Sequence, residues 1–398
     1  MASTGLRVSA VVAAVAFLAG CQGQEEPAAA PETTTTSAAA ASGVDVAQLE
    51  PGNYPTQPQA KPAPSAQAAV VVEAQRMAEF VVGPWEVDPS LVAQSPFGTL
   101  VIKNAEDVDK VAVAPTSEVA AARKFINGFG TSRNNDADSL TSLQNMVLRF
   151  PTQADAEAAA YEIHTQLTAF GNATAMQALP IPGHEGTFAS RTTLEDDRIA
   201  ITSFTAHGPY LLYQEARSPE SAEAGVALVA RTLDLQKGRI DGFTPVSPDE
   251  FATMDLDPTN LMVRTLPADG AVVTRGVYGP YGILHFQGSP IRASEFYTDA
   301  GVDAAAVSKT WVYQTRDEAA AKQLADNIAA LVTDAQPGPS VPGMPEAKCF
   351  VNEVTAPVAG RNYRCVGTAG RWTITSGSQQ DFDATQQLAA QYLLLVGT

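Results

Sequence analysis

The chain has 398 residues, which is too long for one ordinary core and fits two domains of roughly 150 residues each plus non-globular sequence. Hydrophobic residues make up 45% of the chain, so a sizeable core can form. The 25 Lys and Arg against 43 Asp and Glu give a net charge of −18. This balance argues against a nucleic-acid binder and against a basic patch that adsorbs to anionic lipid.

Residues 1–20 are predicted to be an export signal. Arg7 precedes an apolar run from Val8 to Leu18, which is too short to span a bilayer because a spanning helix needs about 20 residues. The run ends in Leu-Ala-Gly-Cys21, which resembles the lipobox of bacterial lipoproteins. The resemblance implies cleavage before Cys21 and acylation of its thiol, with palmitate-type chains that anchor the protein to the extracytoplasmic face of the cell membrane. The alternative is an ordinary secretory signal with an incidental Cys.

Residues 21–66 are predicted to be a tether. They consist mostly of Ala, Pro, Thr, Ser, Gln and Glu, with a run of four Thr at 33–36. Such a composition cannot bury enough apolar surface to offset the entropy of ordering the chain. We therefore expect this segment to hold a folded head away from the membrane.

The remaining chain contains two similar segments, and we predict two α+β units at 67–245 and 246–398. Residues 148–167 and 311–331 each read as a short strand, a Thr and an amphipathic helix. Thr152 with Asp155, and Thr315 with Glu318, match the capping box or its acidic variant. Each copy continues with a predicted β-hairpin and a last helix. The hairpins lie at 198–216 and 362–377, with breaks at Gly208-Pro209 and Gly370.

Each copy therefore reads as strand, helix, strand, strand, helix. This order predicts a mostly antiparallel sheet with helices packed on one face. Additional helices are expected at 68–82 and near 292–300. Matching order and spacing favours a duplication, and the alternative is chance similarity of amphipathic segments.

Several short motifs resemble a family of actinobacterial envelope lipoproteins of unknown function. They are the step from Gly370 to Trp372 after Cys365, the segments 386–392 and 76–80, and residues 86–89. More remotely, a unit of this kind with a hairpin disulfide is similar to the extracellular sensor domain of mycobacterial membrane kinases. This chain departs from that pattern, because it has one Cys pair rather than two and no kinase domain or transmembrane helix.

Cys349 and Cys365 are the thiols that remain once Cys21 is acylated. They lie in predicted adjacent strands of an exported protein, which favours a disulfide closing a loop of about 15 residues. Redox or metal-binding roles are the alternatives, but there is no Cys-x-x-Cys spacing and no nearby His. The first copy has Thr187 and Thr202 at the corresponding places.

Motifs for catalysis are absent. There is no Gly-x-Ser-x-Gly, Ser-x-x-Lys or His-Glu-x-x-His pattern and no phosphate-binding loop, so no catalytic residue, metal or cofactor is predicted. The four His residues are scattered, and His285 lies in a predicted alternating strand at 283–286. The acidic segment 134–138 lacks the Gly and Glu that a calcium loop requires, so a solvated turn is the better interpretation.

Aromatic residues beside Gly-Pro steps are the remaining candidates for a site. Trp85, Tyr210 and Tyr281 each follow such a step, and a rigid turn could present their rings to an apolar ligand. The alternative is that they are core residues at turn ends.

The sequence is consistent with three functions. The first is a non-catalytic envelope protein that binds a small apolar molecule or acts as a scaffold. The second is an accessory lipoprotein that contacts another envelope protein. The third is an envelope-modifying enzyme whose site is assembled across the chain. A deep apolar cavity would favour the first, whereas an exposed apolar patch without a cavity would favour a protein partner.

Overall fold

The computed structural model describes residues 43–397, apart from 113, 138–139, 171–175, 195, 271 and 355–359. The predicted signal peptide, Cys21 and the first part of the predicted tether lie outside the described residues. Within the described ranges, the helices are all too short or too polar to cross a lipid bilayer.

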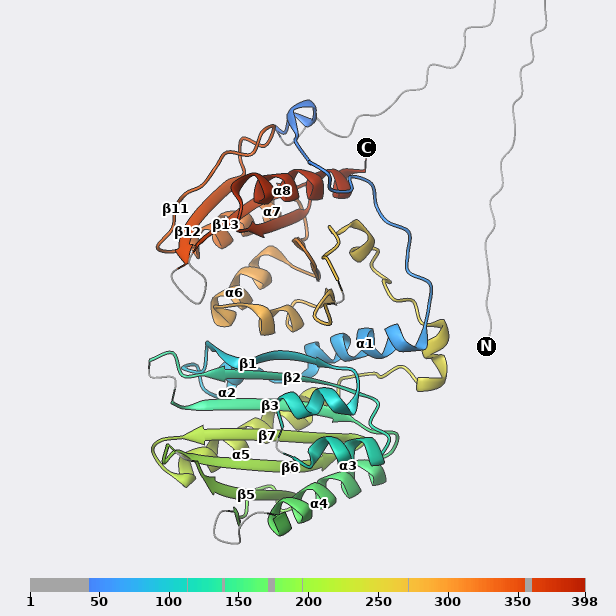
Figure 1. Cartoon of the computed structure of the whole chain (residues 1–398), viewed down its shortest axis with the longest axis vertical. Helices are drawn as coiled ribbons and strands as arrows, with labels where there is room; N and C mark the ends of the chain where they lie inside the picture. The colour runs from blue at the N-terminus through green and yellow to red at the C-terminus, as the bar shows by residue number, and fades with distance from the viewer. Residues whose placement is uncertain are drawn as a thin grey trace, which may run out of the picture. The chain divides into compact units, whose positions relative to one another are not determined.

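Two seven-stranded sheets, both antiparallel, form the framework of the fold (Figure 1). The first has the order β1-β2-β3-β7-β6-β5-β4. Its strands are β1 Ala93–Ile102, β2 Asn127–Asn134, β3 Ser142–Arg149, β4 Met176–Ala178, β5 Thr187–Thr193, β6 Ile199–His207 and β7 Tyr210–Ser218.

The second sheet repeats this topology. Read from β8, its order is β8-β9-β10-β14-β13-β12-β11, which matches the first sheet strand for strand. The α+β class with two similar units is therefore confirmed. The strands are β8 Gly276–Tyr278, β9 Ala304–Val307, β10 Trp311–Gln314, β11 Gln336–Pro337, β12 Lys348–Val354, β13 Gly360–Ala369 and β14 Trp372–Ser378.

The helices also correspond between the units. Helices α3 and α6 connect the first two strands of their sheets, α4 and α7 follow the third strand, and α5 and α8 follow the last strand. The α-helices are α1 Ala66–Met77, α2 Pro84–Val87, α3 Thr116–Ala122, α4 Gln153–Phe170, α5 Ala222–Ile240, α6 Pro290–Ala300, α7 Glu318–Ala330 and α8 Asp381–Val396. Short 3-10 helices are η1 Val46–Gln48, η2 Ala78–Phe80, η3 Ala105–Lys110, η4 Pro248–Thr253, η5 Met262–Arg264 and η6 Gly282–Phe286.

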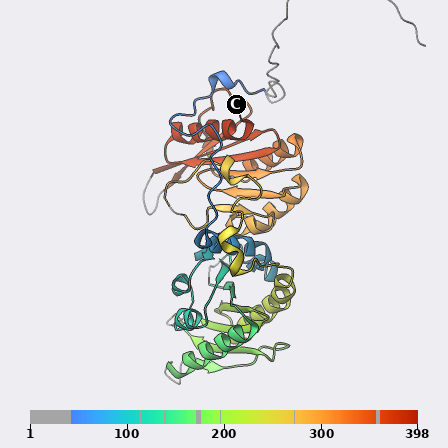
Figure 2. The same ribbon diagram turned by 90° about the vertical axis from the view of Figure 1, so that its right-hand side faces the viewer.

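Helices cover both faces of each sheet, so the expectation of helices on one face is wrong. Ile163 of α4 shares a core with Leu148, whereas Leu233 of α5 shares another core with Val147. Leu148 and Val147 are neighbours on β3 and point to opposite faces of the sheet. Strand β3 is buried along nearly its whole length, and a strand buried on both sides needs a cover on each face. Figure 2 shows helices flanking the strands of both units.

The second unit follows the same rule. Leu324 of α7 shares a core with Tyr313, and Leu388 of α8 shares another with Val312, the neighbour of Tyr313 on β10. Helix α7 begins at an Asp317 cap, whose side chain accepts from the N–H of Ala320 at 2.8 Å. The predicted Thr315 cap is therefore wrong by two residues, because Asp317 offers a stronger acceptor at the first free N–H groups.

Residues 43–65, which we call the strap, are not a free tether. The N–H of Asp45 donates to the carbonyl of Gly343 at 2.8 Å, and the Tyr54 hydroxyl donates to Asp383 on α8 at 2.5 Å. Val46 and Leu49 pack against the core beneath α8. The strap has too few apolar residues for a core of its own, but those few pack on an existing one. The prediction of a tether up to residue 66 is thus corrected for this segment.

Cys349 and Cys365 form a disulfide between β12 and β13, where they are register partners with Cα atoms 4.0 Å apart. Thr187 and Thr202 are not the equivalent pair. Thr187 faces Thr205, to which it hydrogen bonds at 2.8 Å. Counted back from the two-residue turns at Gly208 and Gly370, the residue that takes the place of Cys365 in the first unit is Ser203.

Candidate functional site

A large cavity lies where α1, the chain from Val246 to Gly279 and the start of β9 meet. Its volume is about 850 Å³. We call it the linker cavity, because much of its wall is the irregular chain between the two sheets. The apolar side chains that line it include Val71, Val72, Met254, Leu256, Met262 and Val277.

The sequence of α1 explains one wall of the linker cavity. Three consecutive Val at 70–72 place apolar side chains over more of the helix than one core-facing stripe can use. Ala74 and Met77 are fully buried in the core, whereas Val71 and Val72 stay half-buried and line the cavity. One face of the helix therefore packs in the core, and another face lines the cavity.

Buried polar side chains hold the irregular wall in place. Gln75, on α1, is 3% exposed and its amide donates to the carbonyls of Val273 at 3.0 Å and Arg275 at 2.7 Å. Asp257 accepts from the N–H of Val263 at 3.0 Å. A Cβ on Gly276 would lie 2.2 Å from the Gln75 amide oxygen, so glycine is required where the wall approaches α1.

The charged residues of the linker cavity fall into two groups. Lys103 and Arg275 line it, and their side chains make no ion pair within the described ranges. Its other charged residues are paired: Asp255 with Lys61 at 2.8 Å, Asp303 with Arg371 at 2.9 Å, and Arg76 with Glu73. The cavity thus combines a mainly apolar lining with two cations that have no ion pair among the described residues.

The lining has few side chains that could act as nucleophiles or as general acids and bases. Its described residues include no His, Cys or Ser, and Thr259 donates its hydroxyl to Asp257 at 3.1 Å. Across the part of the chain that the structure describes, His, Cys, Asp and Glu nowhere gather in a group of three that could hold a metal ion. The arrangement is suited to enclosing an apolar molecule.

Trp85 and Tyr281, two predicted site residues, come together, but they do not line the linker cavity. Their ring centroids are 6.4 Å apart, and Trp85 is only 5% exposed. The Tyr281 hydroxyl accepts from the N–H of Gly83 at 2.8 Å and donates to Glu86. The Arg239 guanidinium lies 4.4 Å from the centre of the Tyr281 ring. These contacts pack both side chains against the protein, although Pro280, which precedes Tyr281, is itself exposed.

His285 lies beside Trp85, in the 3-10 helix η6 rather than in the predicted strand. Its Nε2 is 3.0 Å from the carbonyl of Ala78, while Nδ1 is buried without a partner in the described chain. Burial lowers the pKa of His285 to about 3. Arg133 donates to the carbonyl of His285 at 2.8 Å, and burial lowers the pKa of Arg133 to about 10. The cluster joins the first sheet to η6 and is structural.

Tyr210, the third predicted site residue, lies elsewhere in the core. It is the first residue of β7 after the Gly208-Pro209 turn and is the register partner of Arg149. Burial raises its pKa. The structure therefore brings two of the three aromatic candidates together, and all three are buried or bonded side chains away from the linker cavity.

The other His residues are separate from one another. His184 Nε2 is 3.2 Å from the carbonyl of Ala230, and His207 Nε2 is 2.6 Å from Asp241. His164 stacks on Phe188. Burial lowers the pKa of His164.

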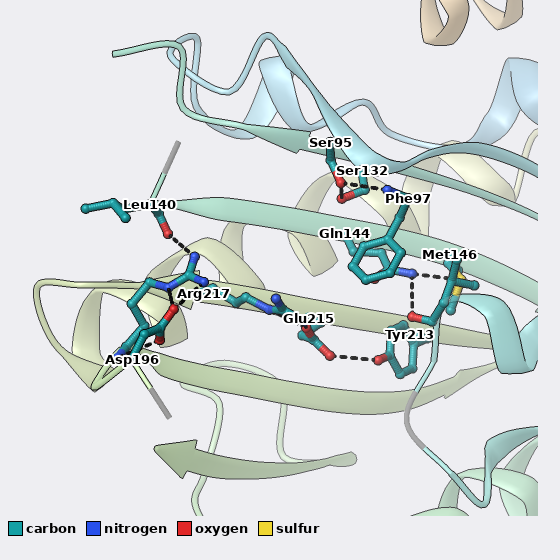
Figure 3. A network of polar contacts seen from close by, with 12 residues as sticks. Ser95, Phe97, Ser132, Leu140, Gln144, Met146, Asp196, Tyr213, Glu215 and Arg217 are labelled. Carbon is teal, nitrogen blue, oxygen red and sulfur yellow. Dashed lines mark hydrogen bonds and ion pairs between the residues drawn. The ribbon is translucent and has the colours of Figure 1, made fainter. Parts of the chain in front are cut away.

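A smaller, polar cavity of about 220 Å³ lies on the first sheet and is lined by Gln144, Glu215 and Arg217 (Figure 3). Glu215 accepts from the Tyr213 hydroxyl at 3.2 Å and from Arg217 Nε at 2.7 Å. The Phe97 ring centre lies 5.9 Å from the Arg217 guanidinium carbon. The polar groups here satisfy one another, so this cavity is a weaker candidate than the linker cavity.

Comparison with known proteins found no match among curated proteins. Among solved structures, the chain is similar to the extracellular domain of PknH from Mycobacterium tuberculosis. The two share 12% identity with a TM-score of 0.29, over 45% of this chain and 97% of that one. Two family models match the sequence, the N-terminal domain of unknown function DUF7373 over residues 60–256 and its C-terminal counterpart over 261–398. The chain therefore belongs to the two-domain DUF7373 family, whose function is unknown.

Proposed function

We propose that this protein is a membrane-anchored, non-catalytic component of the cell envelope that binds an apolar small molecule in the linker cavity. The observation that carries the proposal is the cavity itself, with its volume of about 850 Å³ and its wall of Val, Met and Leu side chains. Binding sites for small molecules typically have about 300–1,000 Å³ and a mainly apolar lining with few polar groups.

The charges of the cavity refine the class of ligand. Lys103 and Arg275 could meet a polar or acidic end group, while the Val and Met side chains contact an apolar body. In a chain with a net charge of −18, two cations without ion pairs in one cavity favour an amphipathic molecule over a polyanion. A molecule of the fatty-acid type has this chemistry.

Filling the cavity should abolish this binding. Ala68 and Val72 are half-buried on α1 and line the cavity, so Ala68→Trp combined with Val72→Trp places two indole rings inside it. We expect the affinity for cis-parinaric acid, a fluorescent fatty acid, to fall at least about tenfold, a loss of about 1.4 kcal/mol or more. The measurement is a fluorescence titration of the full chain.

The matched control is Ala66→Trp. Ala66 is exposed on the same helix and does not line the cavity, so its variant should bind like the wild type. Equal affinity in all three proteins, at unchanged melting temperatures, would refute the assignment of the ligand to this cavity. Failure of the wild type to bind any fatty-acid probe would refute the ligand class.

Membrane anchoring is the other half of the proposal. Acylation of Cys21 is supported by the Leu-Ala-Gly-Cys sequence at the end of the apolar run. Two or more acyl chains are needed for stable anchoring, so loss of the acylated thiol should release the protein. We expect Cys21→Ala to leave the membrane fraction or to accumulate with its signal uncleaved. Mass spectrometry of the amino-terminal peptide measures the change. The same lipid mass on that peptide in both proteins would contradict the anchor.

A further inference from the structure

A second large cavity, of about 630 Å³, lies on the second sheet beside α6 and α7. Its floor is formed by three adjacent strands. Trp311 on β10 pairs with Thr375 on β14, and Thr375 pairs with Val366 on β13. Two residues further along each strand, Gly377 pairs with Arg364. All five residues line this cavity, which we call the Trp311 cavity, and it shares no described lining residue with the linker cavity.

The first unit is hollowed at the equivalent place, but there a carboxylate side chain makes the hollow smaller and polar. Tyr210 and Trp372 both follow the two-residue hairpin turns, so Glu215 occupies the position of Gly377. Glu215 lines the polar cavity of about 220 Å³ and is hydrogen bonded to Tyr213 and Arg217, and Figure 3 labels all three residues. In the second unit, a glycine replaces this carboxylate and leaves the floor open.

Backbone geometry does not require glycine at position 377. Its φ is not in the left-handed region, and an added Cβ would meet only the carbonyl of Tyr363, at an ordinary 3.7 Å. Glycine in a strand without such a need is typical of a site where another group approaches the backbone closely. The open space lies directly beside the register partner of Gly377, Arg364.

The charged residues described in the lining of the Trp311 cavity, Lys309 and Arg364, are both cations. None of its described lining residues is acidic, although the chain has 43 Asp and Glu. Arg364 is exposed, and its side chain makes no hydrogen bond or ion pair within the described ranges. The other cation, Lys309, is held by Asp269 at 2.7 Å. Among the described residues that line this cavity, Arg364 is therefore the cation without an ion pair.

Aromatic side chains complete the lining. Trp311 is half-buried, with its ring centre 6.5 Å from that of Tyr313, and Phe296 and Tyr297 of α6 also line the cavity. A flat ring can stack on such side chains, and a guanidinium binds a carboxylate through two parallel hydrogen bonds. We propose that the Trp311 cavity is a second binding site, which takes a small aromatic anion with its carboxylate at Arg364 above Gly377 and its ring against Trp311.

The test uses the full chain and 2-naphthoate, an aromatic carboxylate, in isothermal titration calorimetry. We expect Gly377→Glu, which introduces the first unit's residue, to lose at least about tenfold in affinity, because it fills the floor and repels the anion. Gly377→Gln has nearly the same volume without the charge and should lose less. Gly377→Ala should bind within about threefold of the wild type.

Arginine variants test the charge separately. Arg364→Gln should weaken 2-naphthoate binding about five- to tenfold, because it removes the charged partner of the carboxylate. Arg361→Gln makes the same change on the same strand at a residue that does not line the cavity, and it should have no effect. Binding of cis-parinaric acid should be unchanged in Gly377→Glu, since the linker cavity is separate. No binding of 2-naphthoate to the wild type, or an affinity of Gly377→Glu and Arg364→Gln equal to that of the wild type, would overturn the proposal.

Discussion

Replacing Glu73 with Ala is expected to lower the free energy of unfolding by about 3–5 kcal/mol. Glu73 lies on α1 with no exposed surface and accepts from Arg149 at 3.4 Å and from the N–H of Val246 at 2.7 Å. Arg149 is 6% exposed; burial lowers its pKa, and the nearby Glu73 carboxylate acts in the opposite direction by stabilising the buried charge. Removing Glu73 leaves a buried cation and a buried N–H without their acceptor. Urea unfolding followed by circular dichroism measures the loss.

A double variant separates the unpaired charge from the lost packing. Glu73→Leu combined with Arg149→Met removes both charges and should recover much of the stability, since apolar pairs often replace buried ion pairs at little cost. Val246 and Arg76 contact Glu73 and also line the linker cavity, so Glu73→Ala should weaken ligand binding as well. A loss below about 1 kcal/mol would mean that Glu73 is not the acceptor that satisfies Arg149.

Acid should destabilise the protein through His285. Its pKa is about 3 in the folded protein and about 6.5 when unfolded, so the unfolded chain binds the proton more readily between these values. Stability contributed by neutral His285 is therefore complete above pH 6.5 and falls as the pH drops towards 3. Between pH 7 and pH 5 the loss from this one group should be about 2 kcal/mol.

Carboxylates also titrate in this range, so the comparison variant is His285→Phe. Phe keeps the ring contacts with Trp85 and Phe129 but cannot be protonated. Between pH 7 and pH 5, the free energy of unfolding of His285→Phe should fall by about 2 kcal/mol less than that of the wild type. Equal pH dependence of the two proteins would show that His285 is protonated as easily in the folded state as in the unfolded state.

The elements with strong local patterns were predictable from sequence. The hairpin breaks at Gly208-Pro209 and Gly370 and the apolar stripes of α4 and α8 depend on residues close together in the chain. The repeated order of strands and helices indicated two similar units for the same reason. Helices on both faces were missed, because burial of β3 on two sides depends on distant segments rather than on its own alternation.

The site was less predictable, because its parts are joined by long-range contacts. Trp85 and Tyr281 meet only through folding, and the bond of Gln75 to Arg275 spans 200 residues. The Pro- and Asp-rich chain after residue 241 reads as a domain boundary, yet part of it forms a cavity wall. The three consecutive Val at 70–72 are the one local feature that could have pointed to the linker cavity, since they exceed what one core-facing stripe needs.

Native mass spectrometry of the full-length protein, extracted from its own membranes in mild detergent, tests the central claim most directly. We predict that the wild type and Ala66→Trp carry a non-covalently bound apolar molecule, and that Ala68→Trp with Val72→Trp has lost it. Fragmentation of the released molecule would identify it. A wild-type protein that is empty in repeated preparations, or a filled variant that retains the same molecule, would contradict the assignment of ligand binding to the linker cavity.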